Sequence, residues 1–165
     1  VFVCIENILE LCYDYKKRRC SMEKLICKSL LWKTGLTDGV DYSRTLDEIL
    51  LFDTSNDMLL ELESCSYDYD AAFDILQRFW KYECKEFSVD EFGKTLLEDL
   101  RAIYNSNIFS IQDYGRKCYS LWQLLPNELH MEEPFHVLSY ADDPLSWGDE
   151  SQTRKIYEEL FDFYK

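Results

Sequence analysis

Residues 88–103 read SVDEFGKTLLEDLRAI and contain the clearest helix signal in the sequence. Ser88 followed by Glu91 is a capping box, in which the two side chains accept hydrogen bonds from amides that the first helical turn leaves open. Apolar residues then recur at intervals of three or four, as they do on one face of a helix: Phe92, Leu96, Leu100 and Ile103. The stretch therefore predicts an amphipathic helix with one buried face.

The same signals recur on both sides of this helix. Capping residues followed by helically spaced apolar residues predict further helices over 5–15, over 21–35, from Thr45, from Thr54, from Asp68 or Asp70, from Ser110 to Pro126, and from about Ser151. Strand signals are weak, because the one Asp-Gly pair lies between two predicted helices. We therefore expect an all-α fold, a single globular domain over 1–165 with about seven to nine helices. A small accessory hairpin near 34–42 or 134–141 stays open.

Composition agrees with one folded domain. A chain of 165 residues fits one core, and its 16% aromatic content argues against disorder. The apolar stretches are far shorter than the roughly 20 residues that cross a bilayer. Seven cysteines without a C-x-x-C pair, and no export-signal pattern, predict reduced thiols and a cytoplasmic location.

Charge is the strongest compositional feature. The sequence has 32 acidic and 18 basic residues, for a net charge of −14. Residues 35–75 hold 11 acidic residues and a single basic one, Arg44, and residues 126–165 hold 10 acidic and 3 basic residues. Such a field repels nucleic acid and anionic membranes and attracts basic surfaces. We therefore expect a basic protein partner and no direct contact with nucleic acid or membrane.

Catalytic and metal-binding signatures are weak. The chain has no G-x-S-x-G elbow and no glycine-rich phosphate loop, so we expect neither enzyme activity nor a cofactor. The only histidines, His130 and His136, are the first and last residues of the sequence HMEEPFH. Glu133 with His136 matches the E-x-x-H spacing of helical metal sites. No second E-x-x-H exists, and Pro134 disfavours a helix there. This favours a surface loop without metal.

The sequence YDYD at 67–70 interleaves aromatic and acidic side chains at the end of the most acidic part of the chain. Asp68 or Asp70 is a predicted helix N-cap. Aromatic side chains are also common anchors in protein interfaces, and carboxylates around them steer basic partners. The candidate partner-binding residues are Tyr67, Asp68, Tyr69 and Asp70, with Asp53, Asp57, Glu61 and Glu63 as flanking charges.

These features favour one functional hypothesis and leave two alternatives. A small acidic protein can inhibit a nuclease by placing carboxylates in its basic site. The first hypothesis is accordingly an immunity-type inhibitor that neutralises a basic bacterial toxin, for example a nuclease. One alternative is a nucleic-acid mimic or adaptor that binds a basic DNA- or RNA-binding protein. The other is a small enzyme or metal-binding protein that uses His130 and His136.

Overall fold

The computed structural model describes residues 22–65, 67–84 and 87–165. These residues form helices joined by turns, and no strand occurs among them. The predicted all-α fold is confirmed, and the number of helices lies within the predicted range. The accessory hairpin is wrong, because a turn at 34–39 leads directly into a helix and 135–139 form a 3₁₀ helix. The predicted helix over 5–15 lies outside the described residues.

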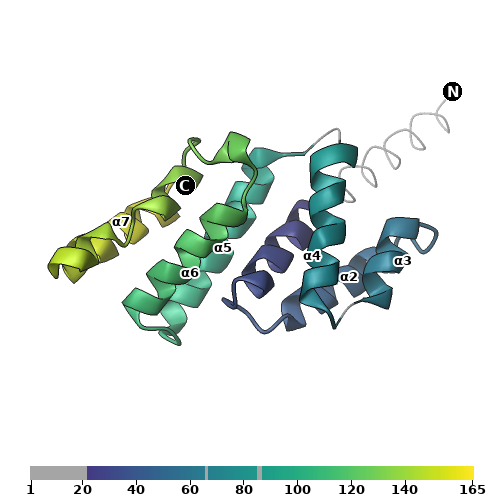
Figure 1. Cartoon of the computed structure of the whole chain (residues 1–165), viewed down its shortest axis with the longest axis horizontal. Coiled ribbons are helices and arrows are strands. Elements are labelled where there is room, and N and C mark those ends of the chain that lie inside the picture. Colours follow the sequence, from purple (N-terminus) through teal and green to yellow (C-terminus); the bar gives the residue numbers. More distant parts are fainter. Residues whose placement is uncertain (1–21, 66, 85–86) are drawn as a thin grey trace, which may run out of the picture.

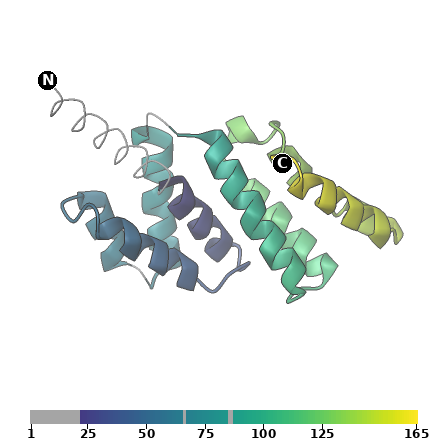
Figure 2. The same ribbon diagram turned by 180° about the vertical axis from the view of Figure 1, so that it is seen from behind.

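Helical residues 22–33 are followed by α2 (Val40–Leu50), α3 (Asp57–Ser64), α4 (Tyr69–Arg78), the π-helical turn η1 (Phe79–Glu83), α5 (Val89–Ser106), α6 (Ile111–Leu124), the 3₁₀ segments η2 (Asn127–Leu129), η3 (Phe135–Ser139) and η4 (Asp143–Trp147), and α7 (Glu150–Phe161). Figures 1 and 2 show α2 and α3 at one end of the molecule and α7 at the other, with α4, α5 and α6 between them. The acidic segments 35–75 and 126–165 therefore occupy different parts of the fold.

The serine caps of α5 and α6 are confirmed, although the Ser88 amide donates to Glu23 Oε1 at 2.9 Å and not to Glu91, so the second half of the predicted capping box does not form. Ser88 Oγ accepts a hydrogen bond from the Glu91 amide at 3.3 Å, and Ser110 Oγ accepts one from the Asp113 amide at 3.0 Å. The helix predicted from Thr54 begins slightly later, because Asn56 caps α3 by accepting from the amides of the following turn. These local contacts fix where the helices start.

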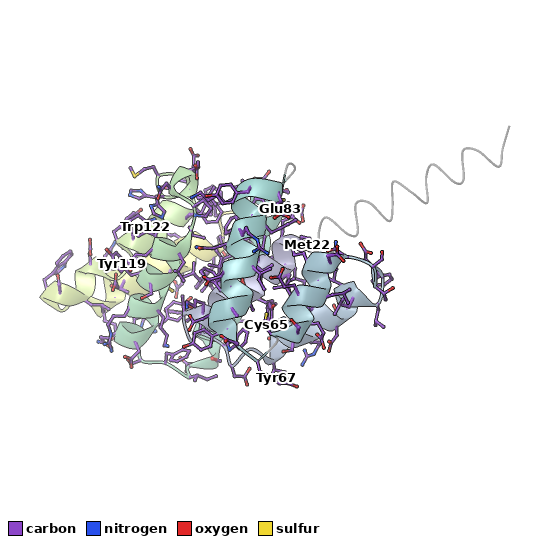
Figure 3. All side chains as sticks on the ribbon, turned by 45° about the vertical axis from the view of Figure 1, so that its right-hand side comes forward. Met22, Cys65, Tyr67, Glu83, Tyr119 and Trp122 are labelled. Carbon is purple, nitrogen blue, oxygen red and sulfur yellow. The ribbon has the colours of Figure 1, made fainter. Side chains whose placement is uncertain are left out.

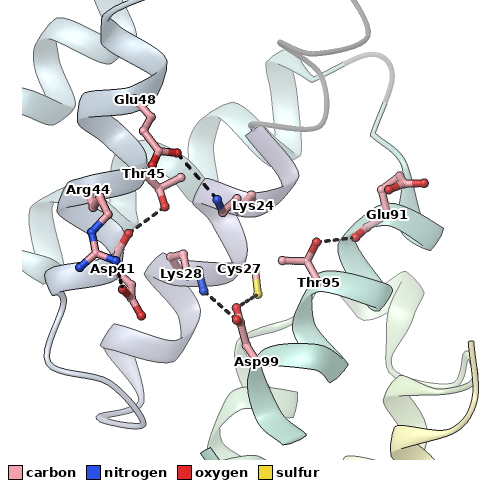
Figure 4. Close-up of polar contacts among 10 residues, drawn as sticks. All are labelled: Lys24, Cys27, Lys28, Asp41, Arg44, Thr45, Glu48, Glu91, Thr95 and Asp99. Atoms are coloured by element: carbon pink, nitrogen blue, oxygen red, sulfur yellow. Dashed lines mark hydrogen bonds and ion pairs between the residues drawn. The ribbon is translucent and has the colours of Figure 1, made fainter. Parts of the chain in front are cut away.

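The predicted cap at Thr45 is wrong. Thr45 lies inside α2, where its hydroxyl donates to the Asp41 carbonyl at 2.8 Å (Figure 4). The helix instead starts after Gly39, which has φ +87° and would bring a Cβ to 2.6 Å from the Trp32 ring. Only glycine fits this backbone conformation beside the ring. The Trp32 ring then stacks on Tyr42 at 5.2 Å, which fixes α2 against residues 22–33.

The core is one continuous cluster that extends from Leu25 to Phe161. Phe92, Leu96 and Leu100 are fully buried in it, as the α5 pattern predicts. Burial of such a stripe provides most of the stability of a helical domain.

A polar contact supplements the apolar packing between residues 22–33 and α5. Lys28 Nζ lies 2.7 Å from Asp99 Oδ1, and Cys27 Sγ donates to Asp99 Oδ2 at 3.5 Å (Figure 4). Burial, with the nearby Asp99 carboxylate, raises the pKa of the Cys27 thiol well above its ordinary value. Cys27 is therefore a neutral packing group. None of the described helices has the length and apolar character needed to cross a membrane.

Candidate functional site

The 11 acidic residues of 35–75 lie on α2, α3, α4 and the turns beside them, in the half of the molecule away from α7 (Figures 1 and 2). Four of them form ion pairs: Asp41 with Arg44, Glu48 with Lys24, Glu61 with Arg78, and Asp70 with Lys33. The others have no ion-pair partner within the part of the chain that the structure describes. We call these residues, together with Tyr67, the acidic surface: Asp38, Asp47, Asp53, Asp57, Glu63, Tyr67, Asp68 and Asp74.

Tyr67 is the most exposed aromatic side chain among the described residues. It lies in the turn between α3 and α4 and is 98% exposed (Figure 3). The next residue, Asp68, caps α4 by accepting hydrogen bonds from the amides of Asp70 and Ala71, each at 3.1 Å. The predicted N-cap is thereby assigned to Asp68. Since a carboxylate can accept more than these two bonds, Asp68 keeps capacity for a partner.

Carboxylates from α3 and from the α4 cap lie close together around the Cys65 thiol. Burial raises the pKa of this thiol, and the carboxylates of Asp68 and Glu61 raise it further. Burial and the nearby Cys65 raise the pKa of the Tyr42 hydroxyl, and Glu63 on the last turn of α3 raises it by a smaller amount. The carboxylates of Glu61 and Asp68 thus both act on Cys65, two residues before Tyr67.

Tyr69 and Asp70 contact the body of the protein. The Tyr69 ring meets Trp32 edge-on, with centroids 5.6 Å apart, and Lys33 Nζ lies 5.0 Å from the centroid of the Tyr69 ring. The same lysine forms the ion pair with Asp70. These two residues hold α4 against helical residues 22–33, whereas Tyr67 and Asp68 remain at the surface. Any contact of Tyr69 or Asp70 with a partner stays a prediction.

The remaining candidate residues lie along α3. Glu61 reaches across to α4, where its carboxylate lies 3.0 Å from Arg78 Nη2. Asp57 begins α3 and Asp53 precedes it, so both lie at the opposite end of this helix from Tyr67, about 10 Å along its axis. Asp53 accepts a hydrogen bond from the Ser55 hydroxyl at 3.2 Å. The predicted residues therefore form one strip rather than one compact cluster.

Two exposed leucines of this region were not recognised in the sequence. Leu51 follows the last residue of α2 and is 81% exposed, and Leu60 on the outer side of α3 is 48% exposed. The sequence held no clear signal for Leu60, because adjacent apolar residues on another short helix, Ile75 and Leu76 of α4, are both buried. Apolar side chains among unpaired carboxylates provide contact area for a partner.

The aromatic residues of the acidic segments divide between core and surface. Tyr42, Phe73 and Tyr157 are buried, whereas Phe52, Tyr67, Tyr140 and Trp147 are exposed. Helical spacing alone did not separate the two groups.

The histidine segment has packing contacts. The His130 ring lies against Trp122 with centroids 4.4 Å apart, and Trp122 Nε1 donates to the His130 carbonyl at 3.2 Å. The His136 ring meets Tyr140 edge-on at 5.3 Å. Among the residues that the structure describes, no three His, Cys, Asp or Glu side chains are grouped as a metal site would require. Both histidine rings thus pack against neighbouring aromatic side chains.

Comparisons with models of protein families, with curated proteins and with solved structures gave no match. Function is therefore inferred from the chemistry of the acidic surface.

Proposed function

We propose that this protein is an acidic binding module whose acidic surface binds a basic protein partner. The observation that supports this most strongly is the group of carboxylates on α2–α4 that have no ion-pair partner among the described residues, beside the fully exposed Tyr67. A folded domain gains nothing in stability from such mutual repulsion. A basic partner would relieve it.

Electrostatics and apolar contact would have different parts in this binding. Unpaired carboxylates attract a cationic partner over distances near the Debye length, about 8 Å at physiological salt, and so raise its association rate. Tyr67, Leu51 and Leu60 would then lose exposed apolar area against the partner and slow its dissociation.

We further propose an immunity-type role in the cytoplasm of a bacterium, in which the acidic surface occupies the cationic site of a toxin such as a nuclease. Carboxylates can take the positions of substrate phosphates in such a site, and the Tyr67 ring can take the place of a stacked base. A nucleic-acid mimic that blocks a basic DNA- or RNA-binding protein would use the same surface. The two roles differ in the partner and not in the chemistry of the surface.

The immunity role is tested by co-expression with the product of the adjacent gene in a host that this product kills. We expect the wild-type chain to restore growth and the double variant Asp57→Lys/Glu63→Lys to lose this protection. The matched control is Glu98→Lys/Glu158→Lys, which changes net charge equally at exposed positions on α5 and α7. Equal protection by both double variants would contradict the proposal, and a DNA-binding protein as the adjacent product would favour the mimic.

A further inference from the structure

A groove of about 710 Å³ lies beside the acidic surface. One wall is formed by α4 and η1, and the other by the end of α6 with η2. The rings of Trp80 and Phe87 line it with their centroids 4.8 Å apart, and Leu124 and Leu129 line the opposite wall. Its volume is within the range of roughly 300–1,000 Å³ that is usual for binding sites. The groove is large enough for a bulky apolar side chain.

The groove separates the two acidic parts of the molecule. Asp74, a member of the acidic surface, lines one wall, and Glu128 lines the other. Neither carboxylate has an ion-pair partner in the described part of the chain. Residues 126–149, which include Glu128, hold six acidic residues and no lysine or arginine. A segment lying across the groove would therefore have unpaired negative charge on both sides.

The end of α6 adds to this negative potential. The helix ends at Leu124 in the groove wall and has no basic residue in its last turn. The open carbonyl groups of a helix C-terminus carry partial negative charge and favour cations. The aromatic faces of Trp80 and Tyr82 can also bind a guanidinium group by cation–π contact. Tyr82 is 72% exposed, with Lys81 already over its ring.

Two cations also line the groove. Arg78 is already held by Glu61 at 3.0 Å and by Glu83 at 4.0 Å. Lys81 has no carboxylate partner among the described residues, and its Nζ lies 5.2 Å from the centroid of the Tyr82 ring. Lys81 therefore opposes a cationic occupant, so its removal should tighten the binding of an occupant whose basic side chains come near it.

We propose that this groove receives a large apolar side chain of the basic partner, from a segment in which arginine or lysine flanks that side chain. The inference rests on the proposed function and identifies what the partner presents. The apolar side chain covers Trp80 and Phe87, and its basic neighbours meet Asp74 on one side and Glu128 on the other. The groove thereby selects among basic partners that the acidic surface alone would attract equally.

The test uses dye-labelled peptides that alternate arginine with glycine and carry either tryptophan or alanine at the centre, with affinity measured by fluorescence anisotropy on the full chain. We expect the tryptophan peptide to bind about tenfold more tightly, as burial of one large apolar side chain allows. Asn127→Trp and Gln77→Trp, which place a bulky ring in the groove from exposed positions on its two walls, should each abolish this preference. Tyr119→Ala on α6, outside the groove lining, is the control and should retain it.

The charge of the occupant is tested separately with Lys81→Gln. If arginine side chains of the occupant come near Lys81, this variant should bind both peptides more tightly, and unchanged or weaker binding would overturn the flanking basic residues of the proposal. The inference is overturned if the tryptophan preference is absent or survives in both filled variants. If Asp57→Lys/Glu63→Lys still weakens both peptides in that case, the acidic surface remains and only the groove fails. If this double variant binds like the wild type, the proposed function fails as well.

Discussion

Asp70 forms an ion pair with Lys33, which lies 37 positions earlier in the chain, and the same lysine lies 5.0 Å from the centroid of the Tyr69 ring. One side chain of helical residues 22–33 thus holds two of the four residues of YDYD. Asp68 meanwhile caps α4 and Tyr67 contacts solvent. Helix initiation, anchoring of the helix and partner contact are therefore assigned to different residues of one short sequence.

Loss of the Lys33–Asp70 pair should cost little stability. The Asp70 side chain is 63% exposed, and ion pairs of this kind contribute about 0–1 kcal/mol. We expect Asp70→Asn to lower the free energy of unfolding by up to about 1 kcal/mol in urea denaturation. Asp74→Asn is the matched control, because it removes the same charge from the same helix without breaking an ion pair in the described structure. A larger loss for Asp74→Asn would contradict the assignment.

Asp68 has two separable functions, and two substitutions distinguish them. Asp68→Ala removes the cap of α4 and should lower the free energy of unfolding by about 0.5–2 kcal/mol. Asp68→Asn keeps an oxygen for the cap and removes only the charge, so stability should be nearly unchanged. If Asp68 also meets the partner, Asp68→Asn should slow association with a basic peptide. Unchanged stability in Asp68→Ala would contradict the capping role.

The half-buried carboxyl of Asp142 should make stability depend on pH. It lies against Gly115 of α6, where a Cβ would come within 2.6 Å of Asp142 Cβ, and burial raises its pKa, with a contribution from Asp143. An acid with a raised folded-state pKa binds its proton more tightly in the folded state. Its stabilising contribution is therefore present below the unfolded-state pKa of about 3.9 and is lost as pH rises through the folded-state pKa.

Asp142→Asn removes this titration. We expect the free energy of unfolding of the variant to rise relative to that of the wild type between pH 4, which is about the unfolded-state pKa, and pH 7. Urea denaturation at each pH measures this difference. Asp143→Asn removes a neighbouring charge that helps to raise the Asp142 pKa, so it should reduce the pH dependence of stability without abolishing it. A difference between Asp142→Asn and wild type that is constant with pH would exclude the burial effect.

The buried thiols should be unreactive in the folded protein. Cys118 is fully buried and burial raises its pKa to about 12, and Cys27 is similarly buried with a raised pKa. Because the thiolate is the reactive form, both should resist maleimide labelling at neutral pH, while the partly exposed Cys65 labels sooner. Peptide mapping after timed labelling measures this, with urea-unfolded protein as the control. Labelling of Cys118 as fast as Cys65 would show that the core opens readily.

Local sequence signals predicted much of the fold. The capping residues Ser88 and Ser110 and the apolar spacing of α5 depend on neighbours within one or two turns, so they were readable without a structure. Thr45 was misassigned because the start of α2 depends on Trp32, which packs against Gly39. The division of YDYD likewise depends on Lys33, a contact between distant positions that no local pattern contains. The exposed Leu51 and the groove between α4 and α6 also arise only from tertiary packing.

The most direct test of the central claim compares the association rates of two variants whose acidic residues are reversed to lysine in different places. Asp57→Lys/Glu63→Lys and Glu98→Lys/Glu158→Lys change the net charge equally, but only the first pair lies on the acidic surface. Association rates are measured for the arginine–glycine peptide with central tryptophan at increasing salt. We predict that the first variant associates about tenfold more slowly at low salt, with the difference vanishing as salt screens the charges, and that the second stays close to wild type. Equal slowing of both variants would contradict the claim, because net charge and not the acidic surface would then govern binding.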